Sequence, residues 1–257
     1  MKSTFALRSF LLGSSLALLA SQSAHAASGT WTGTAAGPFN WSDTTQWSGG
    51  TVADGAGFNA ALNNSTGVSV TTTLDSARTI GGISKGGSAV SNINWTITDA
   101  TNQLTLDNGA SNVGISNGQN AISVLTVDTN ILLNSNLAIS ANGNNNAAIT
   151  LGSTVGARSI TGAKNITISS SSGFGNGVIT FNSNISTSGS FTNAQTGTGG
   201  GSVVVDGIIG PNVTGVTQNV TGTAGRSLTP TRCFSARAAQ VPLPAPPHPL
   251  SRVMGTA

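Results

Sequence analysis

Short apolar runs in which apolar and polar residues alternate recur along most of the chain. Val68-Ser69-Val70, Leu104-Thr105-Leu106 and Ile166-Thr167-Ile168 are examples. Alternation with a period of two, rich in Val, Ile and Thr, is typical of half-buried strands. No segment has a 3.6-residue apolar stripe long enough to predict a helix. The pattern therefore predicts an all-β fold.

Two all-β architectures fit the separators between these runs, such as Asn117-Gly118, Asn142-Gly143 and Asp206-Gly207. Hairpins at such turns would build a β-sandwich. Stacking of like residues coil on coil would instead build a right-handed parallel β-helix. Only 7% of the chain is charged, and neutral ladders of Asn and Thr explain this better than an ordinary globular surface does. The strand clusters recur at roughly 20–30 residues, as in solenoid repeats. We therefore predict a β-solenoid over residues 63–225.

Residues 1–26 have the features of a secretory signal peptide. Lys2 and Arg8 precede a short apolar run, and a small-x-small sequence ends at Ala26. Cleavage after Ala26 or after Ala27 is expected, so that Ala27 or Ser28 begins the mature chain. The apolar run is too short to span about 30 Å of hydrocarbon. No later segment is apolar enough for a transmembrane helix, so we expect a secreted chain, placed outside the cell or at the bacterial cell surface or outer membrane.

The basic overall charge comes from the two ends of the chain. The whole chain has a formal net charge of +3. Residues 27–225, however, have four basic and seven acidic residues, a net charge of −3. Nucleic-acid binding depends on clustered Lys and Arg that neutralise phosphates. This body has no such cluster, and we expect no nucleic-acid partner.

Residues 27–62 form a tryptophan-rich opening segment. Trp41 and Trp47 are six residues apart, an even spacing that places both indoles on one face of a strand. With Trp31 they have two interpretations. The favoured one is an N-terminal cap in which the indoles bury the first coil of the solenoid. The alternative is an aromatic platform on which a sugar ring would stack.

Residues 226–257 differ in composition from the rest of the chain. They include six of the eight prolines, four of the arginines and the only cysteine, but no asparagine. Proline lacks the N–H that a β-ladder needs. We predict a disordered, Pro-rich tail. We also hypothesise that this tail is read out of frame and that the chain is a truncated piece of a longer repeat protein.

The opening segment resembles a known family. The resemblance rests on residues 31–33 (Trp-Thr-Gly), 40–43 (Asn-Trp-Ser-Asp), 46–50 (Gln-Trp-Ser-Gly-Gly) and 54–57 (Asp-Gly-Ala-Gly). They are similar to the N-terminus of bacterial autotransporter-associated β-strand repeat proteins. By motif the resemblance covers residues 31–62, and by composition it extends to about residue 225. It implies a passenger-like region outside the cell. Phe58 stands where the family typically has an acidic residue, and the repeat that names the family is not found.

The mature body lacks the usual catalytic side chains. Residues 27–225 contain no His, Cys or Glu, so Ser-His-Asp and Cys-His arrangements and zinc sites are not expected. The seven aspartates stand at strand ends or turns, where capping is the favoured role. Calcium-binding nonapeptides and phosphate-binding loops are also missing. Gly81-Gly82 and Gly86-Gly87, on either side of Lys85, are interpreted as loop residues. We expect no enzyme, no cofactor and no metal.

The favoured function is that of a non-enzymatic, adhesin-like or structural surface protein. Such a protein would work by presenting a long stiff β-surface to surface glycans or other cell-surface proteins. Two alternatives remain open. The first is a polysaccharide-active β-helix enzyme that uses stacked Asp carboxylates, and the second is a carbohydrate-binding module built on Trp31, Trp41 and Trp47. Self-association through open solenoid ends is a further expectation.

Overall fold

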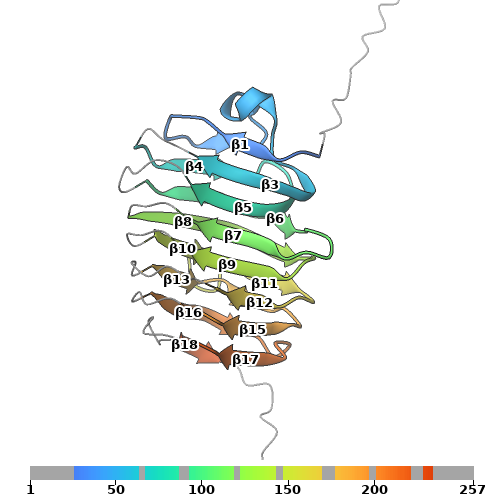
Figure 1. The fold of residues 1–257 in the computed structure, drawn as a ribbon, viewed down its shortest axis with the longest axis vertical. Coiled ribbons are helices and arrows are strands. Elements are labelled where there is room, and N and C mark those ends of the chain that lie inside the picture. Colours follow the sequence, from blue (N-terminus) through green and yellow to red (C-terminus); the bar gives the residue numbers. More distant parts are fainter. Residues whose placement is uncertain are drawn as a thin grey trace, which may run out of the picture.

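The fold is a stack of β-coils, each running across the long axis of the molecule (Figure 1). A computed structural model describes residues 26–63, 67–86, 93–118, 122–142, 147–169, 177–196, 201–220 and 228–233. The chain enters at one end of the stack and descends coil by coil to β18 at the other end (Figure 1). Successive coils therefore bring together residues that are distant in sequence.

Strands dominate the described residues. They are β1 (Gly29–Trp31), β2 (Phe39–Asn40), β3 (Gly55–Asn63), β4 (Val70–Thr73), β5 (Arg78–Gly86), β6 (Trp95–Leu106), β7 (Val113–Asn117), β8 (Ser123–Leu133), β9 (Leu137–Ala141), β10 (Ala147–Leu151), β11 (Ser159–Gly162), β12 (Ile166–Ile168), β13 (Val178–Phe181), β14 (Asn184–Ile185), β15 (Ser190–Asn193), β16 (Ser202–Ile209), β17 (Gly215–Gln218) and β18 (Leu228–Cys233). Two short 3-10 helices, η1 (Thr44–Gln46) and η2 (Ser48–Gly50), precede β3.

Each coil has three faces, and the long strands turn the corners between them. The first face stacks β2, β4, β6, β8, β10, β13, β16 and β18. The second stacks β5, β6, β8, β11, β14 and β16. The third stacks β1, β3, β5, β7, β9, β12, β15 and β17. All these pairings are parallel, so the fold is a three-faced solenoid.

The register gives the length of one coil. Successive partners on the first face are Val70, Trp95, Leu125, Ile149, Ile179, Val203 and Leu228, a rise of 24 to 30 residues per coil. This agrees with the spacing of strand clusters in the sequence. The predicted β-solenoid is confirmed, and the β-sandwich is wrong, because a sandwich of hairpins would pair its strands antiparallel.

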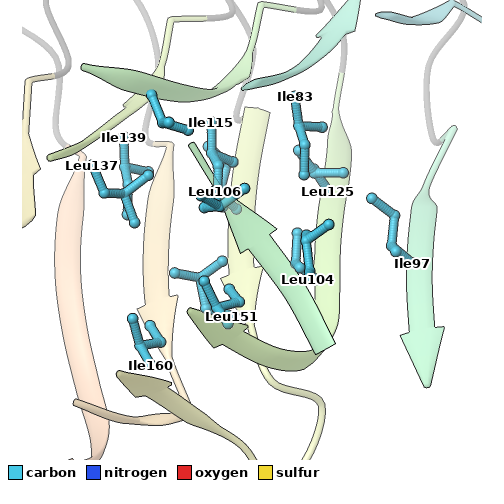
Figure 2. Packing of buried hydrophobic residues seen from close by; sticks show 14 of the residues in the cluster. Ile83, Ile97, Leu104, Leu106, Ile115, Leu125, Leu137, Ile139, Leu151 and Ile160 are labelled. Atoms are coloured by element: carbon cyan, nitrogen blue, oxygen red, sulfur yellow. The ribbon is translucent and has the colours of Figure 1, made fainter. Parts of the chain in front are cut away.

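Like residues stack on like along the solenoid. The inward column of the first face consists of Val70, Trp95, Leu125, Ile149, Ile179 and Val203, all of them buried. The outward column beside it consists of Thr71, Thr96, Thr126, Thr150 and Thr180, all half-buried. Figure 2 shows the interior, where Ile and Leu side chains from different strands meet. Each fully buried aliphatic side chain contributes about 1.5–3 kcal/mol.

Asparagine side chains connect neighbouring coils at the corners. The Oδ1 atoms of Asn94, Asn130 and Asn136 accept the backbone N–H groups of Val124, Ser159 and Asn165, at 3.0–3.1 Å. Asn165 and Asn184 accept from Ser190 and Ile208 in the same way, both at 2.9 Å. Each of these bonds gives a backbone N–H group a side-chain acceptor on the preceding coil. Asparagine at the corners therefore has a structural role, because its side chain bonds one coil to the next.

The prediction that the glycines on either side of Lys85 are loop residues is wrong for those that the structure describes. Gly81, Gly82 and Gly86 belong to a strand rather than to loops. A Cβ on Gly81 would lie 2.5 Å from the backbone carbon of Gly57, so only glycine allows the preceding coil to approach this closely. Gly87 lies outside the described residues.

The ends of the described fold bear on the predicted boundaries. The predicted signal peptide lies outside the described residues, except for Ala26, so its cleavage after Ala26 or Ala27 stays a prediction. Ala27 already exchanges backbone hydrogen bonds with Asp54, at 2.8 and 3.1 Å.

At the other end, β18 pairs with β16, so the solenoid continues past the predicted limit at residue 225. Pro230 is tolerated there because β18 is the outermost described strand of its face. The rest of the tail that we predicted to be disordered, residues 226–227 and 234–257, lies outside the described residues. In the part of the chain that the structure describes, no helix is long and apolar enough to cross a membrane.

A lysine is buried on the third face. Lys85 is in register with Leu62 and Asn117 on the third face, and only 2% of its surface is exposed. Burial disfavours the charged ammonium group and lowers the pKa of Lys85 from 10.5 to about 8. The folded state therefore binds this proton less tightly than the unfolded chain does.

We expect Lys85→Met to stabilise the protein at neutral pH. Below about pH 8 the lysine is protonated in both states, and the desolvation of its charge lowers the stability of the folded state. As the pH rises from about 8 to 10.5 the cost disappears, so wild-type stability should rise by up to about 3 kcal/mol. The chain has no tyrosine to obscure this range. Urea unfolding at pH 7 and 10.5 measures the effect. A variant that keeps the wild-type pH dependence would contradict it.

Candidate binding surface

The tryptophan cluster forms the core of the N-terminal cap. Trp31 and Trp41 are fully buried, and Trp47 is 2% exposed. Trp47 packs edge-on against both other indoles, with ring centroids 5.1 Å apart in each pair. The Nε1–H groups of Trp41 and Trp47 donate to the carbonyl oxygens of Ala53 and Trp41, at 2.8 Å. The cap interpretation agrees with this geometry. The three indoles are buried and present no open face on which a sugar ring could stack.

Trp95 joins the cluster from the first face of a later coil. Its ring centroid lies 5.4 Å from that of Trp31, with the two planes nearly perpendicular. The sequence places Trp95 in the solenoid rather than in the cap, and only the coil register brings the two segments together. The indoles therefore attach the cap to the stack.

The aspartates that the enzyme hypothesis needs are engaged in structural bonds. Arg78 lies between Asp54 and Asp75, 2.9 Å from the first carboxylate and 3.3 Å from the second. Burial alone would raise the pKa of Asp75, but hydrogen bonds from Ser42 and Arg78 and the charge of Arg78 outweigh it and lower the pKa. A glycosidase needs one carboxyl with a raised pKa. The Arg78 guanidinium therefore lies between two carboxylates that the coils bring close together, and the pKa of Asp75 is lowered rather than raised.

Asp128 connects two coils in a similar way. Its carboxylate accepts the backbone N–H and the hydroxyl of Ser153, at 3.0 and 2.7 Å, and the Nε–H of Arg158, at 3.0 Å. Burial would raise the pKa of Asp128, but these bonds and the charge of Arg158 lower it overall. Asp99 caps its own turn by accepting from Thr101 and Asn102. The contacts of Asp99 agree with the predicted capping role, whereas Asp128 accepts from the next coil rather than from its own turn. Among the described residues, no three His, Cys, Asp or Glu come together in a group that could hold a metal ion.

A polar hollow lies on the third face, at the corner where the chain passes from β6 to β7. Its volume is about 260 Å³. We call it the amide hollow. It is lined by Asn59, Gly81, Gly82, Ile83, Ser84, Asn108, Asn112, Gly114 and Ser116, which come from three successive coils. No lining residue is charged.

Glycines create the space. Gly82 and Gly114 occupy neighbouring positions of the third face, where later coils have Ala138 and Thr167. A Cβ on Gly114 would have no atom within 4 Å, so it would project into open space. A Cβ on Gly82 would lie 2.8 Å from the Oδ1 atom of Asn59, whose side chain therefore reaches over it. The floor of the hollow is therefore exposed backbone at Gly114 and is covered by the Asn59 side chain at Gly82.

The side chains at the rim are available to a ligand. Asn108 is fixed, since its Nδ2 donates to the carbonyl oxygen of Asn112 at 2.8 Å. Within the described part of the chain, the side chains of Asn59, Ser84, Asn112 and Ser116 have no hydrogen-bond partner in the protein. The corner asparagines, such as Asn136, use theirs to bind the next coil. Sequence reasoning missed this site. The sequence did contain one signal for it. Glycine stands at the outward position directly before Ile83 and again directly before Ile115, where a side chain would otherwise project from the face.

We expect Trp31→Ala to cost about 3–5 kcal/mol of unfolding free energy, because it removes an indole that packs against the rings of Phe39, Trp47 and Trp95. In the wild type, acrylamide should quench tryptophan emission weakly until the protein unfolds. The chain has four tryptophans, and all of them are buried. Strong quenching in the folded state would contradict the cap.

Asp128→Ala should destabilise the fold by about 2–4 kcal/mol, because it leaves Arg158 and the Ser153 N–H without their acceptor. Asp99→Ala, which affects one turn only, should cost about 1 kcal/mol. Since the folded-state pKa of Asp128 is lowered, its contribution is complete above pH 4 and is lost as the pH falls through the folded pKa. Urea unfolding of both variants at pH 7 and pH 3 tests the difference. Equal losses at pH 7 would show that the inter-coil bonds of Asp128 add nothing.

Comparisons with known proteins identify no relative of this chain. The chain matches no protein-family model, no curated protein and no solved structure. Any assignment of function therefore depends on the residues and contacts described above.

Proposed function

We propose that this chain is an exported, cell-surface β-solenoid that acts as a structural or adhesin-like element. We further propose that it is a passenger-like region of the autotransporter-associated β-strand repeat type. The sequence argument for export is the signal-like segment before Ala27, and the argument for the family is the motif between Trp31 and Gly57.

The observation that most favours a structural element is how the charged side chains are used. Asp54, Asp75 and Asp128 bind arginines, and the bonds connect one coil to another or brace a turn. The outward columns consist largely of hydroxyl and small side chains. Such a body gains rigidity from continuous ladders and offers a long neutral surface. This use of the carboxylates favours presentation of a surface over acid–base chemistry.

Export is tested with the full chain carrying an epitope inserted after Gly109. A Cβ added to this exposed turn residue would meet no atom within 4 Å, so an insertion there should be tolerated. In a Gram-negative host, we expect the epitope to be reached by antibody on intact cells, or to be recovered from the medium. Externally added protease should remove it. The matched control lacks residues 1–26 and should keep its epitope inside the cell, protected from protease. If the full chain behaves like the control, the proposal is wrong.

A further inference from the structure

We propose that the amide hollow binds a short segment of a neutral oligosaccharide. This inference rests on the proposed display of the solenoid outside the cell, because only there would the hollow meet such a chain. Three properties of the hollow lead to it: the chemistry of its rim, the shape of its floor and the pairing of its strands.

The rim matches the hydroxyl groups of a sugar. Each carboxamide of Asn59 and Asn112 offers both donors and an acceptor, and the hydroxyls of Ser84 and Ser116 can do either. A sugar hydroxyl likewise donates and accepts, so every contact has a suitable partner. The lining has no Arg, Lys, Asp or Glu. Uronic or sialic acids would therefore find no counter-charge here, which favours a neutral sugar.

The floor suits a flat ring. Gly114 exposes backbone instead of a side chain, and Gly82 beside it is covered by the side chain of Asn59. A sugar ring has apolar C–H faces between its equatorial hydroxyls, and it could lie on this floor while its edge reaches the amides. The volume of about 260 Å³ is just below the range of roughly 300–1,000 Å³ typical of small-molecule pockets. The hollow therefore fits a short segment of a longer chain.

The strand pairing argues against a peptide in the same place. An extended peptide binds a sheet by adding a strand to a free edge. At the hollow, β5 is paired with β3 on one side and with β7 on the other. Its backbone donors and acceptors are therefore used within the ladder, and the ligand must be recognised through side chains.

Titration calorimetry on the purified full chain tests the proposal, with cellohexaose, laminarihexaose and mannohexaose as neutral probes and hexagalacturonic acid as the acidic one. We expect at least one neutral probe to bind and the acidic probe to bind at least about tenfold more weakly. No binding of any neutral probe, or equal binding of the acidic one, overturns the proposal.

Two variants locate the site. Gly114→Val fills the hollow from its floor and should weaken binding at least about tenfold, and Asn112→Ala should weaken it about three- to tenfold by removing a hydrogen-bonding group. The matched control is Gly215→Val on β17, since a Cβ there also meets no atom within 4 Å and the site is distant along the stack. It should bind as the wild type does. Unchanged thermal unfolding of Asn112→Ala separates loss of binding from loss of fold.

Wild-type affinity in both hollow variants would overturn the assignment of the site. These outcomes are separate from the export experiment. A displayed protein that binds no neutral probe refutes the hollow alone, whereas a chain that binds the probe but stays inside the cell refutes the proposed display.

Discussion

The in-register parallel ladder between coils is the constraint on which this fold depends. Parallel strands place each residue beside its equivalent one coil away, at a spacing of about 4.8 Å. Any side chain that suits its position in one coil must therefore also suit its neighbours above and below. The buried column from Val70 to Val203 and the outward threonines from Thr71 to Thr180 meet this condition. The ladder also explains why a chain so poor in charge can fold, since its polar groups are paired with each other.

Local alternation made the strands predictable. Ile166-Thr167-Ile168 and Leu104-Thr105-Leu106 show their inward and outward positions directly in the sequence, and the turn residues between runs mark the coil length. The interior position of Lys85 was available from the same logic. It stands two residues after Ile83 and so shares its face, but its charge and the flanking glycines suggested a loop.

The cap and the hollow depend on register, which the sequence does not reveal. Coils differ in length, so no strict repeat aligns Trp31 with Trp95 or Asn59 with Asn112. The extra residues accumulate at corners, as in the turn from β6 to β7 that provides Asn108 and Asn112. Similarly, the sequence positions of Asp54 and Asp75 do not reveal that the Arg78 guanidinium lies between their carboxylates in the folded chain. Interactions within one strand were predictable, and interactions between coils of unequal length were not.

The neutral outward columns have a consequence for how the molecule meets a cell. Charged surfaces attract or repel each other over about 8 Å at physiological salt, and that force changes with ionic strength. A face of threonine hydroxyls, such as that from Thr71 to Thr180, has little long-range field of its own. An anionic envelope would neither repel it strongly nor draw it in. Contact would then be decided at short range, by fit and hydrogen bonding, and would vary little between fresh water and brine.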